Sequence, residues 1–488
     1  MPKSKKIEQI FEGATYGDFL FRPQFSVVKS RRDVDLTMPL TRNIRLNVPI
    51  VGANMDTVTR EKMMKTLSLE GCFGFLDRNC SIVEQAARVK HVKRQHSFVI
   101  ENPIMIPRKN TVADAGKILE SQNISTLLVE EGPGSGTLAG ILTHRDLLAA
   151  QGKESEPLER FMTPFRKLVT ASPNISMNNA ENMMLEERIE KLPLINKNRK
   201  ITGLITMRDL RLAKQKPYST KDKKGRLMVG AAIGAAGDYM ERADALVSAG
   251  VDCVLMDVAH SHSDIVKVAV KKFKSKFKSM DLICGNVATK EGAKFLMDLG
   301  ADGIKVGIGP GRGCRTRLEV GAGVPQLQAV REAYLAVQGR VPIIADGGVG
   351  NDKDIALAIL SGASTVMLGS MLSGTDESPG IVIEDPSTRR KVKMYRGMTS
   401  AEAVIDNFLK RDPEDVLTNS QAQEGQSVTV PYVGSVTDVI KRIKDHLRSA
   451  VSYAGEKDLY GAHKKVSSNP ADYFIRLSDA SRKESFER

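Results

Sequence analysis

The sequence contains no tryptophan, and aromatic residues make up only 5% of its 488 positions. A surface that binds nucleic acid by stacking bases on aromatic rings is therefore not expected, although the formal net charge is +14. No apolar run approaches the roughly 18–20 residues that a membrane span requires, so we expect no membrane partner. The lysines near the N-terminus are not followed by an apolar segment, and no secretory signal is predicted.

Cysteine is also scarce, with five residues that are odd in number, widely spread and without a CxxC pair. This pattern excludes a disulfide scaffold and a zinc ribbon and is typical of a reducing compartment, so we predict a cytoplasmic protein. Cys72, Cys253 and Cys284 are interpreted as small buried apolar residues.

Short runs that are apolar throughout recur along the chain, with helical patterns between them. Because these runs do not alternate with polar residues, they predict strands buried on both faces. Eight such strands with helical crossovers predict an α/β fold, a parallel (β/α)8 TIM barrel. The predicted strands are residues 49–54, 72–76, 227–233, 253–257, 282–286, 303–307, 342–347 and 365–370.

About 150 residues separate the second and third of these strands, far more than a crossover needs. An internal repeat fills this gap, because residues 113–147 are echoed by residues 179–210. Each copy predicts the order helix, strand, turn, strand, helix, and the pair predicts one small inserted α+β domain. We assign residues 1–97 and 216–463 to the barrel, 98–215 to the inserted domain (repeats 98–155 and 160–215), and 464–488 to a flexible tail.

The segment KVGIGPGRGCRTR (305–317) leaves a predicted strand and carries four glycines around Cys314. In a barrel this position lies on the C-terminal face, where the loops after the strands build the site. Glycines allow close backbone approach to a ligand, and Arg312, Arg315 and Arg317 favour the thiolate form of a cysteine. Cys314 is therefore a candidate nucleophile.

Two further strand ends, ADGG (345–348) and MLGS (367–370), have the glycines of a phosphate site built from backbone N–H groups. Asp346 would repel a phosphate, so a ribose hydroxyl is its more natural partner. Asp257, at the end of another predicted strand, is a further candidate to bind ribose hydroxyls. The residues alone thus predict a barrel enzyme with a cysteine nucleophile and a phosphorylated, ribose-bearing substrate.

The Cys314 segment, together with ANMDTVT (53–59), GNVAT (285–289), MLGSMLSGTDESPG (367–380) and YRGM (395–398), resembles the IMP dehydrogenase/GMP reductase family over nearly the whole chain. The inserted repeat resembles a tandem CBS (Bateman) module. The resemblance implies chemistry at C2 of a purine nucleoside monophosphate, a covalent thioimidate with Cys314, and hydride exchange with NADPH or NAD.

The resemblance also implies roles for individual residues. Thr316 and Glu424 would relay a proton to the catalytic Cys314, and Arg411 would lie on a mobile flap over about 399–430. The substrate would contact Asn54, Met55, Arg312, Asp346, Gly348, Gly369, Ser370, Tyr395, Gly397 and Met398. The cofactor would lie against Asp257, Asn286 and Gly307, and the backbone of Gly309, Gly311 and Cys314 would hold a potassium ion in a dehydrogenase.

In the inserted repeat, the resemblance implies that Thr143 with Asp146, and Thr206 with Asp209, hold the ribose of a regulatory purine nucleotide (ATP, GTP or GMP). The alternative is that each aspartate simply caps the helix that follows. The family further implies a homotetramer, and nucleotides at the module are expected to alter octamer formation and activity.

The direction of the reaction is harder to predict. A dehydrogenase hydrolyses its thioimidate with an Arg–Tyr pair on the flap, whereas Asp412 follows Arg411 here. DVA (257–259) and GMTS (397–400) are closer to reductases, whereas the inserted module and TDESPG (375–380) are commoner in dehydrogenases. We expect a GMP reductase, with IMP dehydrogenase and a catalytically silent nucleotide-sensing scaffold as alternatives. Arg312 and Asp77 depart from the pattern of both subfamilies, which leaves an altered substrate open.

Overall fold

The computed structural model describes residues 9–94, 99–122, 124–411 and 424–486. It divides into two compact units. The first comprises residues 1–95, 218–222 and 227–488, and the second comprises residues 96–217 and 223–226. No helix among the described residues is long and apolar enough to cross a membrane.

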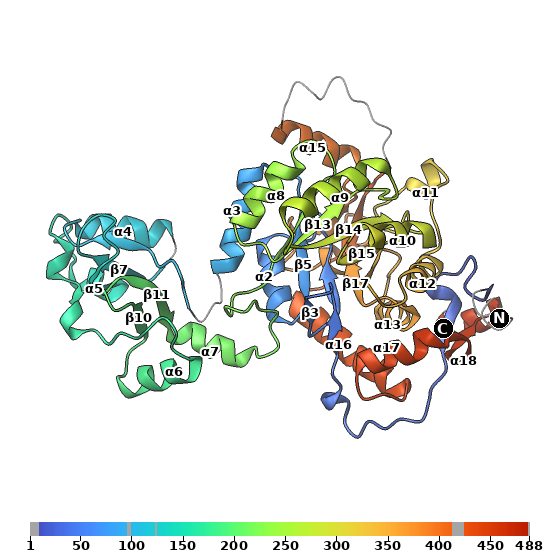
Figure 1. Cartoon of the computed structure of the whole chain (residues 1–488), viewed down its shortest axis with the longest axis horizontal. Helices are drawn as coiled ribbons and strands as arrows, with labels where there is room; N and C mark the ends of the chain where they lie inside the picture. The colour runs from blue at the N-terminus through green and yellow to red at the C-terminus, as the bar shows by residue number, and fades with distance from the viewer. Residues whose placement is uncertain (1–8, 95–98, 123, 412–423, 487–488) are drawn as a thin grey trace. The chain divides into compact units, whose positions relative to one another are not determined.

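A closed parallel barrel of eight strands forms the centre of the first unit (Figure 1), which confirms the predicted fold. Strand β17 pairs with β4 and closes the barrel, with Leu368 opposite Gly52. Side chains such as Ile50, Val254 and Ile344 are completely buried, as expected for strands covered on both faces. The strands are β4 (Ile50–Gly52), β5 (Phe73–Leu76), β12 (Gly230–Ile233), β13 (Cys253–Asp257), β14 (Asp281–Val287), β15 (Gly303–Val306), β16 (Ile343–Asp346) and β17 (Thr365–Leu368).

Amphipathic helices cover the outside of the barrel. In α16 (Val436–Tyr453), Val436, Val439, Ile440 and Ile443 are buried at the spacing of one helix face, so burial of this stripe holds the helix in place. The other helices of this layer are α2 (Glu61–Leu69), α3 (Ile82–Arg94), α8 (Tyr239–Ser248), α9 (Asp264–Lys276), α10 (Lys290–Asp298), α12 (Gln326–Val337) and α13 (Asp352–Ser361).

The second unit contains the two repeats, each in the order helix, strand, turn, strand, helix. Leu128, Leu138 and Ile141 of the first repeat form one buried cluster with Leu204 of the second, so the two copies pack as a single domain. The first copy contains α4 (Val112–Ser121), β7 (Thr126–Glu130), β8 (Leu138–Thr143) and α5 (His144–Ala149), and the second contains α6 (Met177–Glu186), β10 (Lys191–Ile195), β11 (Ile201–Thr206) and α7 (Met207–Gln215).

The C-terminal segment is not a flexible tail, and this prediction was wrong. Strand β21 (Phe474–Arg476) pairs antiparallel with β1 (Phe19–Phe21). The Phe474 ring is buried against Phe11 and Phe19, with centroid distances of 5.6 and 5.7 Å. One aromatic anchor therefore orders a segment whose composition is otherwise polar. The segment also contains the end of α17 (Leu459–Ser468), together with α18 (Pro470–Tyr473) and α19 (Asp479–Phe486).

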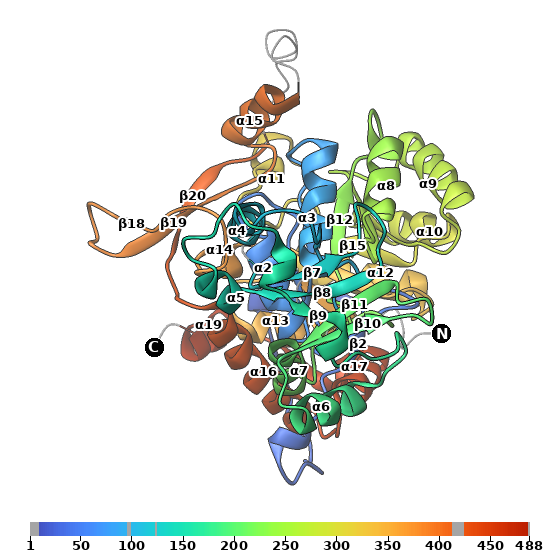
Figure 2. The same cartoon turned by 90° about the vertical axis from the view of Figure 1, so that its left-hand side faces the viewer.

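A three-stranded antiparallel sheet, β18 (Ile383–Glu384), β19 (Lys391–Arg396) and β20 (Ser427–Pro431), lies outside the barrel. Figure 2 shows β18 and β19 at the left, extending away from the barrel strands. Helix α15 (Ala401–Arg411) follows β19, and residues 412–423 of the predicted flap lie outside the described residues. This sheet brings Tyr395 and the end of the flap to the barrel.

Candidate active site

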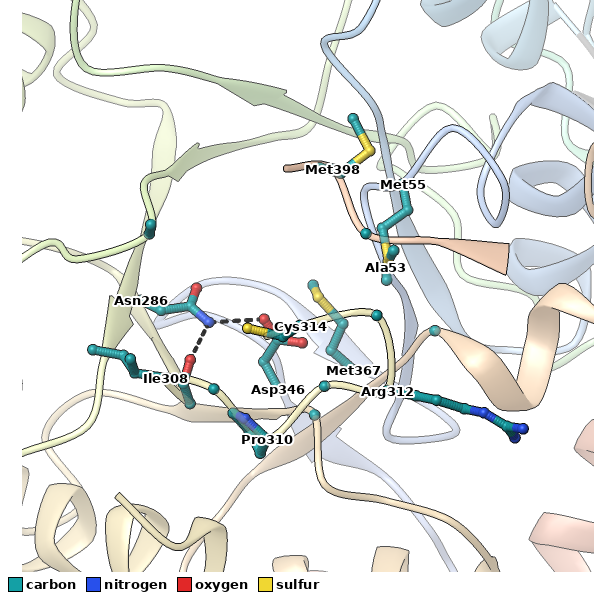
Figure 3. Close-up of a pocket in the computed structure, with 18 of the residues that line it drawn as sticks. Ala53, Met55, Asn286, Ile308, Pro310, Arg312, Cys314, Asp346, Met367 and Met398 are labelled. Atoms are coloured by element: carbon teal, nitrogen blue, oxygen red, sulfur yellow. Dashed lines mark hydrogen bonds between the residues drawn. The ribbon is translucent and has the colours of Figure 1, made fainter. Parts of the chain in front are cut away.

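A cavity of about 1370 Å³ opens at the carboxyl ends of the barrel strands (Figure 3). The loops that line it come from positions far apart in the sequence, as expected for the C-terminal face of a barrel. It brings together Asn54, Met55, Asp257, Asn286, Gly307, Gly309, Gly311, Arg312, Cys314, Thr316, Asp346, Gly348, Gly369, Ser370, Tyr395, Gly397, Met398 and Glu424. Arg411 ends α15, and its side chain lies outside the described part of the chain.

The Cys314 thiol lies at one end of a short chain of hydrogen bonds. Its Sγ is 3.2 Å from Thr316 Oγ1, which donates to Glu424 Oε2 over 2.7 Å. A carboxylate only accepts hydrogen bonds and a hydroxyl has one proton, so the thiol is the donor to Thr316 when Glu424 is ionised. The geometry can therefore move a proton between the sulfur and Glu424.

Backbone pairing with the cysteine loop holds Glu424 in this position. Cys314 forms an isolated antiparallel bridge with Gly425, and the Arg315 N–H donates to the Glu424 carbonyl over 2.7 Å. A Cβ added to Gly313 would lie 2.8 Å from the Gly397 nitrogen. The cysteine loop and the backbone at Gly397 lie so close together that only glycine fits at position 313.

The three arginines near Cys314 have partners other than the thiol. Arg315 pairs with Glu319 over 2.6 Å, and the Arg317 guanidinium donates to the carbonyls of Ile308 and Val324. Arg312 extends away from Cys314 in Figure 3 and is exposed, with Nη2 3.5 Å from the Thr429 carbonyl. Hydrogen bonds thus direct the three arginines to other groups, although Arg317 still lies near enough to Cys314 to interact with it electrostatically.

The remaining cysteines are buried and distinct from Cys314, which is partly exposed. Burial raises the pKa of the Cys284 thiol to about 12 and that of Cys80 to about 11, and it also raises the pKa of Cys72 and Cys253. A thiol held in its protonated form is a poor nucleophile, so Cys314 is the reactive candidate among the five.

A buried lysine that sequence reasoning missed connects the two candidate ribose-binding carboxylates. Lys305 Nζ is 2.8 Å from Asp257 Oδ1 and 2.6 Å from Asp346 Oδ2, and its side chain is 4% exposed. Asn54 donates to Asp257 and Asn286 donates to Asp346, each over 2.9 Å. The signal was present in the sequence, because Lys305 interrupts an otherwise apolar strand.

The charges in this cluster stabilise one another. Burial alone would lower the pKa of Lys305, but the carboxylates of Asp257 and Asp346 raise it above its ordinary value. Burial alone would raise the pKa of Asp257, but Lys305 and the Asn54 amide hold it below its ordinary value. Asp257 and Lys305 therefore carry opposite charges at neutral pH.

In the predicted phosphate region, one of the backbone N–H groups that we expected to face a phosphate has a partner within the protein. The Gly348 N–H donates to the Pro310 carbonyl over 3.1 Å, so it is already engaged within the chain. Tyr395 is buried with its hydroxyl 3.5 Å from Met55 Sδ, and a Cβ added to Gly369 would lie 2.8 Å from that hydroxyl. The Gly369 backbone thus closely approaches Tyr395.

Comparison with known proteins assigns the family. The sequence model described as "IMP dehydrogenase / GMP reductase domain" matches residues 13–487. The chain belongs to the IMP dehydrogenase/GMP reductase family. Members of this family are NAD(P)-dependent oxidoreductases of purine metabolism, and so is this chain.

Similar proteins carry both names of the family. The chain is 42% identical over 474 residues to inosine-5'-monophosphate dehydrogenase of Nitrosopumilus maritimus, covering 96% of each chain. It is also 42% identical over 487 residues to GMP reductase of Leishmania donovani, covering 97% of this chain and 96% of that one. A variant of GMP reductase from Trypanosoma brucei, solved with guanosine 5'-monophosphate, has a TM-score of 0.89 and 39% identity, with 97% of each chain covered.

The nicotinamide cofactor of the IMP dehydrogenase/GMP reductase family fits the polar groups of the cavity. Asn286 Oδ1 is buried and accepts no hydrogen bond from the described residues, while the amide nitrogen of the same side chain donates to Gly307 and Asp346. This oxygen is free to accept a hydrogen bond from an amide-bearing ligand. The residues that would hold the cofactor are Asp257, Asn286 and Gly307.

Potassium, predicted for the dehydrogenases of the family, would need backbone carbonyls from the cysteine loop. Carbonyl oxygens are suitable ligands for a hard cation. The Gly311 carbonyl accepts the Cys314 N–H over 2.9 Å, so one of the three expected ligands already has a partner. No cluster of three or more acidic, histidine or cysteine side chains that could hold a metal ion occurs among the described residues.

In the inserted domain, the predicted nucleotide residues form helix caps. The Thr143 hydroxyl and N–H donate to Asp146 Oδ2 over 2.8 and 2.7 Å at the start of α5. Thr206 donates to Asp209 over 2.6 Å at the start of α7. This is the capping geometry that was the alternative to nucleotide binding.

Asp77, a predicted departure from the family pattern, is not among the residues that line the cavity. Its side chain is completely buried, with Arg88 Nη1 at 3.3 Å and Arg60 Nε at 4.0 Å. Its neighbour Arg78 does line the cavity. Asp77 therefore belongs to a buried ion-pair cluster and not to the lining of the cavity.

Proposed function

We propose that the protein is a GMP reductase, which converts GMP and NADPH to IMP, ammonia and NADP. The observation that carries this direction is that aspartate, and not the tyrosine of a hydrolytic Arg–Tyr pair, follows Arg411. A reductase must keep water from its covalent intermediate, so loss of a water-activating tyrosine favours reduction. The likeness to the Trypanosoma brucei reductase over 97% of each chain supports the same direction.

The arrangement around Cys314 supplies the chemistry at C2 of the purine. The thiol passes its proton through Thr316 to Glu424, and the sulfur forms a bond to C2. Glu424 returns a proton through Thr316 to the 2-amino group, which leaves as ammonia, and a thioimidate remains. The bound nicotinamide supplies the hydride that C2 needs before the C–S bond breaks and Cys314 is regenerated.

The other residues of the cavity bind and orient the nucleotide. Asp346 accepts hydrogen bonds from the ribose, while Gly348, Gly369, Ser370 and Tyr395 surround the phosphate. Asn54, Met55, Gly397 and Met398 lie near the base, and Arg312 adds positive charge at the rim of the site. Each of these residues lines the same cavity as Cys314, which supports their assignment to one ligand.

IMP dehydrogenase is the second candidate. It is favoured by the Nitrosopumilus maritimus dehydrogenase, whose identity to the chain equals that of the Leishmania donovani reductase. In this reaction Arg411, or the Thr316–Glu424 pair, would activate the water that hydrolyses the thioimidate. Potassium at the cysteine loop would then stimulate turnover.

The test follows nicotinamide absorbance with purified protein and either GMP plus NADPH, or IMP plus NAD with potassium. We expect oxidation of NADPH in the first mixture, and its loss in Cys314→Ala. Reduction of NAD in the second mixture without activity in the first would overturn the proposed direction. Cys284→Ala serves as the control for loss of a thiol outside the cavity.

We further propose that the inserted domain is a tandem CBS module that binds ATP, GTP or GMP, that the protein is a homotetramer, and that these nucleotides alter octamer formation and activity. A Trypanosoma brucei GMP reductase solved in complex with guanosine 5'-triphosphate has a TM-score of 0.79 and 36% identity to the chain, and binding of this nucleotide by a similar protein supports the proposal. Light scattering with and without each nucleotide tests the assembly. A mass that no nucleotide changes would contradict the proposal.

A further inference from the structure

The buried Lys305 cluster carries an inference beyond the proton relay. Three strands contribute to it, with Asp257 at the end of β13, Lys305 on β15 and Asp346 at the end of β16. Strand β14 lies between β13 and β15, so the lysine stem must cross β14 to reach Asp257. A Cβ added to Gly285 of β14 would lie 2.5 Å from Lys305 Cβ. Because residue 285 is glycine, the Lys305 side chain has room to pass β14 and reach Asp257 on β13.

The hydrogen bonds of Asp346 divide its two oxygens between protein and cavity. Oδ2 accepts from both Lys305 and Asn286, at 2.6 and 2.9 Å. Oδ1 accepts no hydrogen bond from the described residues, and the side chain remains 22% exposed in the wall of the cavity. The carboxylate is therefore fixed by one oxygen and presents the other to a ligand.

We propose that Lys305 is a positioning residue that locks Asp346 in the orientation that accepts a ribose hydroxyl, while its second contact fixes Asp257 on the cofactor side. The inference rests on the proposed nucleotide site. Without the ammonium group, the two partly exposed carboxylates would lose the cation that bridges them, since Arg78 acts on Asp257 alone, and their repulsion would turn Asp346 away from its position. Selectivity for a ribose hydroxyl thus depends on a side chain that lies behind the carboxylate.

The test measures binding of GMP, 2'-deoxy-GMP and 3'-deoxy-GMP by titration calorimetry, without cofactor. The hydrogen bond of a hydroxyl to a fixed carboxylate predicts that the wild type binds GMP roughly 10- to 100-fold more tightly than at least one deoxy analogue. We expect Lys305→Met to reduce this ratio to within about threefold, and Lys305→Arg, which retains the charge, to restore part of it.

Lys93 offers a matched control. Its side chain is 5% exposed and bridges Asp222 and Asp252, each over 2.8 Å, outside the cavity. Lys93→Met removes a similar buried bridge, so we expect it to lose stability while its preference for GMP stays unchanged. Any general weakening of the fold then appears equally in both variants.

The outcomes separate the proposed function from the proposed role of Lys305. The measurement reports nucleotide binding alone, so it does not depend on whether the enzyme works as a reductase or as a dehydrogenase. Failure of the wild type to bind GMP would overturn the proposed function and this inference together. A Lys305→Met protein that distinguishes the analogues as well as the wild type would overturn the inference alone. Loss of discrimination in Lys93→Met as well would assign the effect to general destabilisation and would also overturn it.

Discussion

At the scale of single residues, the site combines one partly exposed thiol with groups that orient it. Thr316 forms hydrogen bonds with both the Cys314 thiol and Glu424, so among the described hydrogen bonds its hydroxyl is the one that joins them. Replacing Thr316 by a side chain of the same size that lacks the hydroxyl removes the hydrogen bonds but keeps the packing, so the effect on proton transfer can be measured by itself.

Thr316→Val removes this path while preserving the shape of the side chain. We expect kcat to fall by about 10²-fold or more, as for loss of a positioned proton-transfer group, with little change in nucleotide affinity. Steady-state kinetics and calorimetry measure the two quantities. Glu319→Gln, on the same short helix but outside the relay, is the control. An equal loss in both variants would contradict a specific role for Thr316.

At the scale of elements, α15 is tied to the barrel through a shared arginine. Arg396 Nη2 is 2.6 Å from both Asp56 Oδ2 and Asp406 Oδ2, and Asn79 also donates to Asp56. The Asp56 side chain is 1% exposed, whereas Asp406 is 42% exposed. The two halves of this bridge should therefore differ in strength.

The two aspartates lead to different predictions. Asp406→Asn should cost under about 1 kcal/mol, because solvent screens this contact, and should accelerate hydrogen exchange in α15 alone. Asp56→Asn should cost about 3–5 kcal/mol, because it leaves a partly buried arginine without its buried partner. Thermal unfolding and hydrogen exchange measure these effects. Equal destabilisation by the two substitutions would contradict the assignment.

The C-terminal strand is the second element whose role can be tested. Phe474→Ala removes a buried ring from the cluster with Phe11 and Phe19 and should cost about 3–5 kcal/mol. Ile475→Ala, at the next position of β21 but 40% exposed, is the matched control and should cost far less. Thermal unfolding compares the two. A flexible segment would tolerate both substitutions equally.

How far the sequence predicts these elements depends on the kind of information each one needs. The eight barrel strands were predictable because each is apolar along its own length, and the inserted domain because its halves repeat. The ordered structure around Phe474 was not predictable, since it depends on the pairing of β21 with β1 at the other end of the chain. Lys305 is visible in the sequence as a charge within an apolar strand, but its role was missed because its two partners lie on the separate strands β13 and β16.

The same distinction holds within the site. Cys314 could be recognised from the glycines around it, and the Thr316–Glu424 contact from a resemblance to known enzymes. The partners of Arg315 and Arg317 could not be predicted, because proximity in sequence says little about where a long side chain finds its carboxylate or carbonyl. Arginines next to a cysteine in sequence therefore do not by themselves predict hydrogen bonds to its thiol.

At the scale of the whole molecule, one buried histidine links stability to pH. His463 on α17 is 8% exposed and its Nδ1 lies 2.7 Å from the Ile359 carbonyl on α13. Burial, with a smaller effect of nearby Arg331, lowers the pKa of His463 below its ordinary value of about 6.5. The unfolded chain therefore binds a proton that the folded protein does not.

The sign of the effect follows from this difference. The contribution of His463 to stability is complete above about pH 6.5 and is lost as the pH falls below that value. His463→Gln, which can still donate to the carbonyl, should flatten the fall in thermal stability between about pH 7 and pH 5. The His446→Gln variant, with a ring that is 60% exposed, is the control. An unchanged slope in His463→Gln would contradict the prediction.

The pairing of β1 with β21 has a consequence for how the protein is made. The ribosome synthesises the N-terminus first, so β1 cannot pair with β21 until synthesis is almost complete. In the same way, β4 cannot pair with β17 until most of the chain has been made. The inserted domain can fold soon after it is synthesised, because each of its buried apolar clusters joins residues from one continuous stretch of the chain. We therefore expect it to fold while β4 and β5 are still without their later neighbours, which leaves these apolar strands dependent on chaperones during translation.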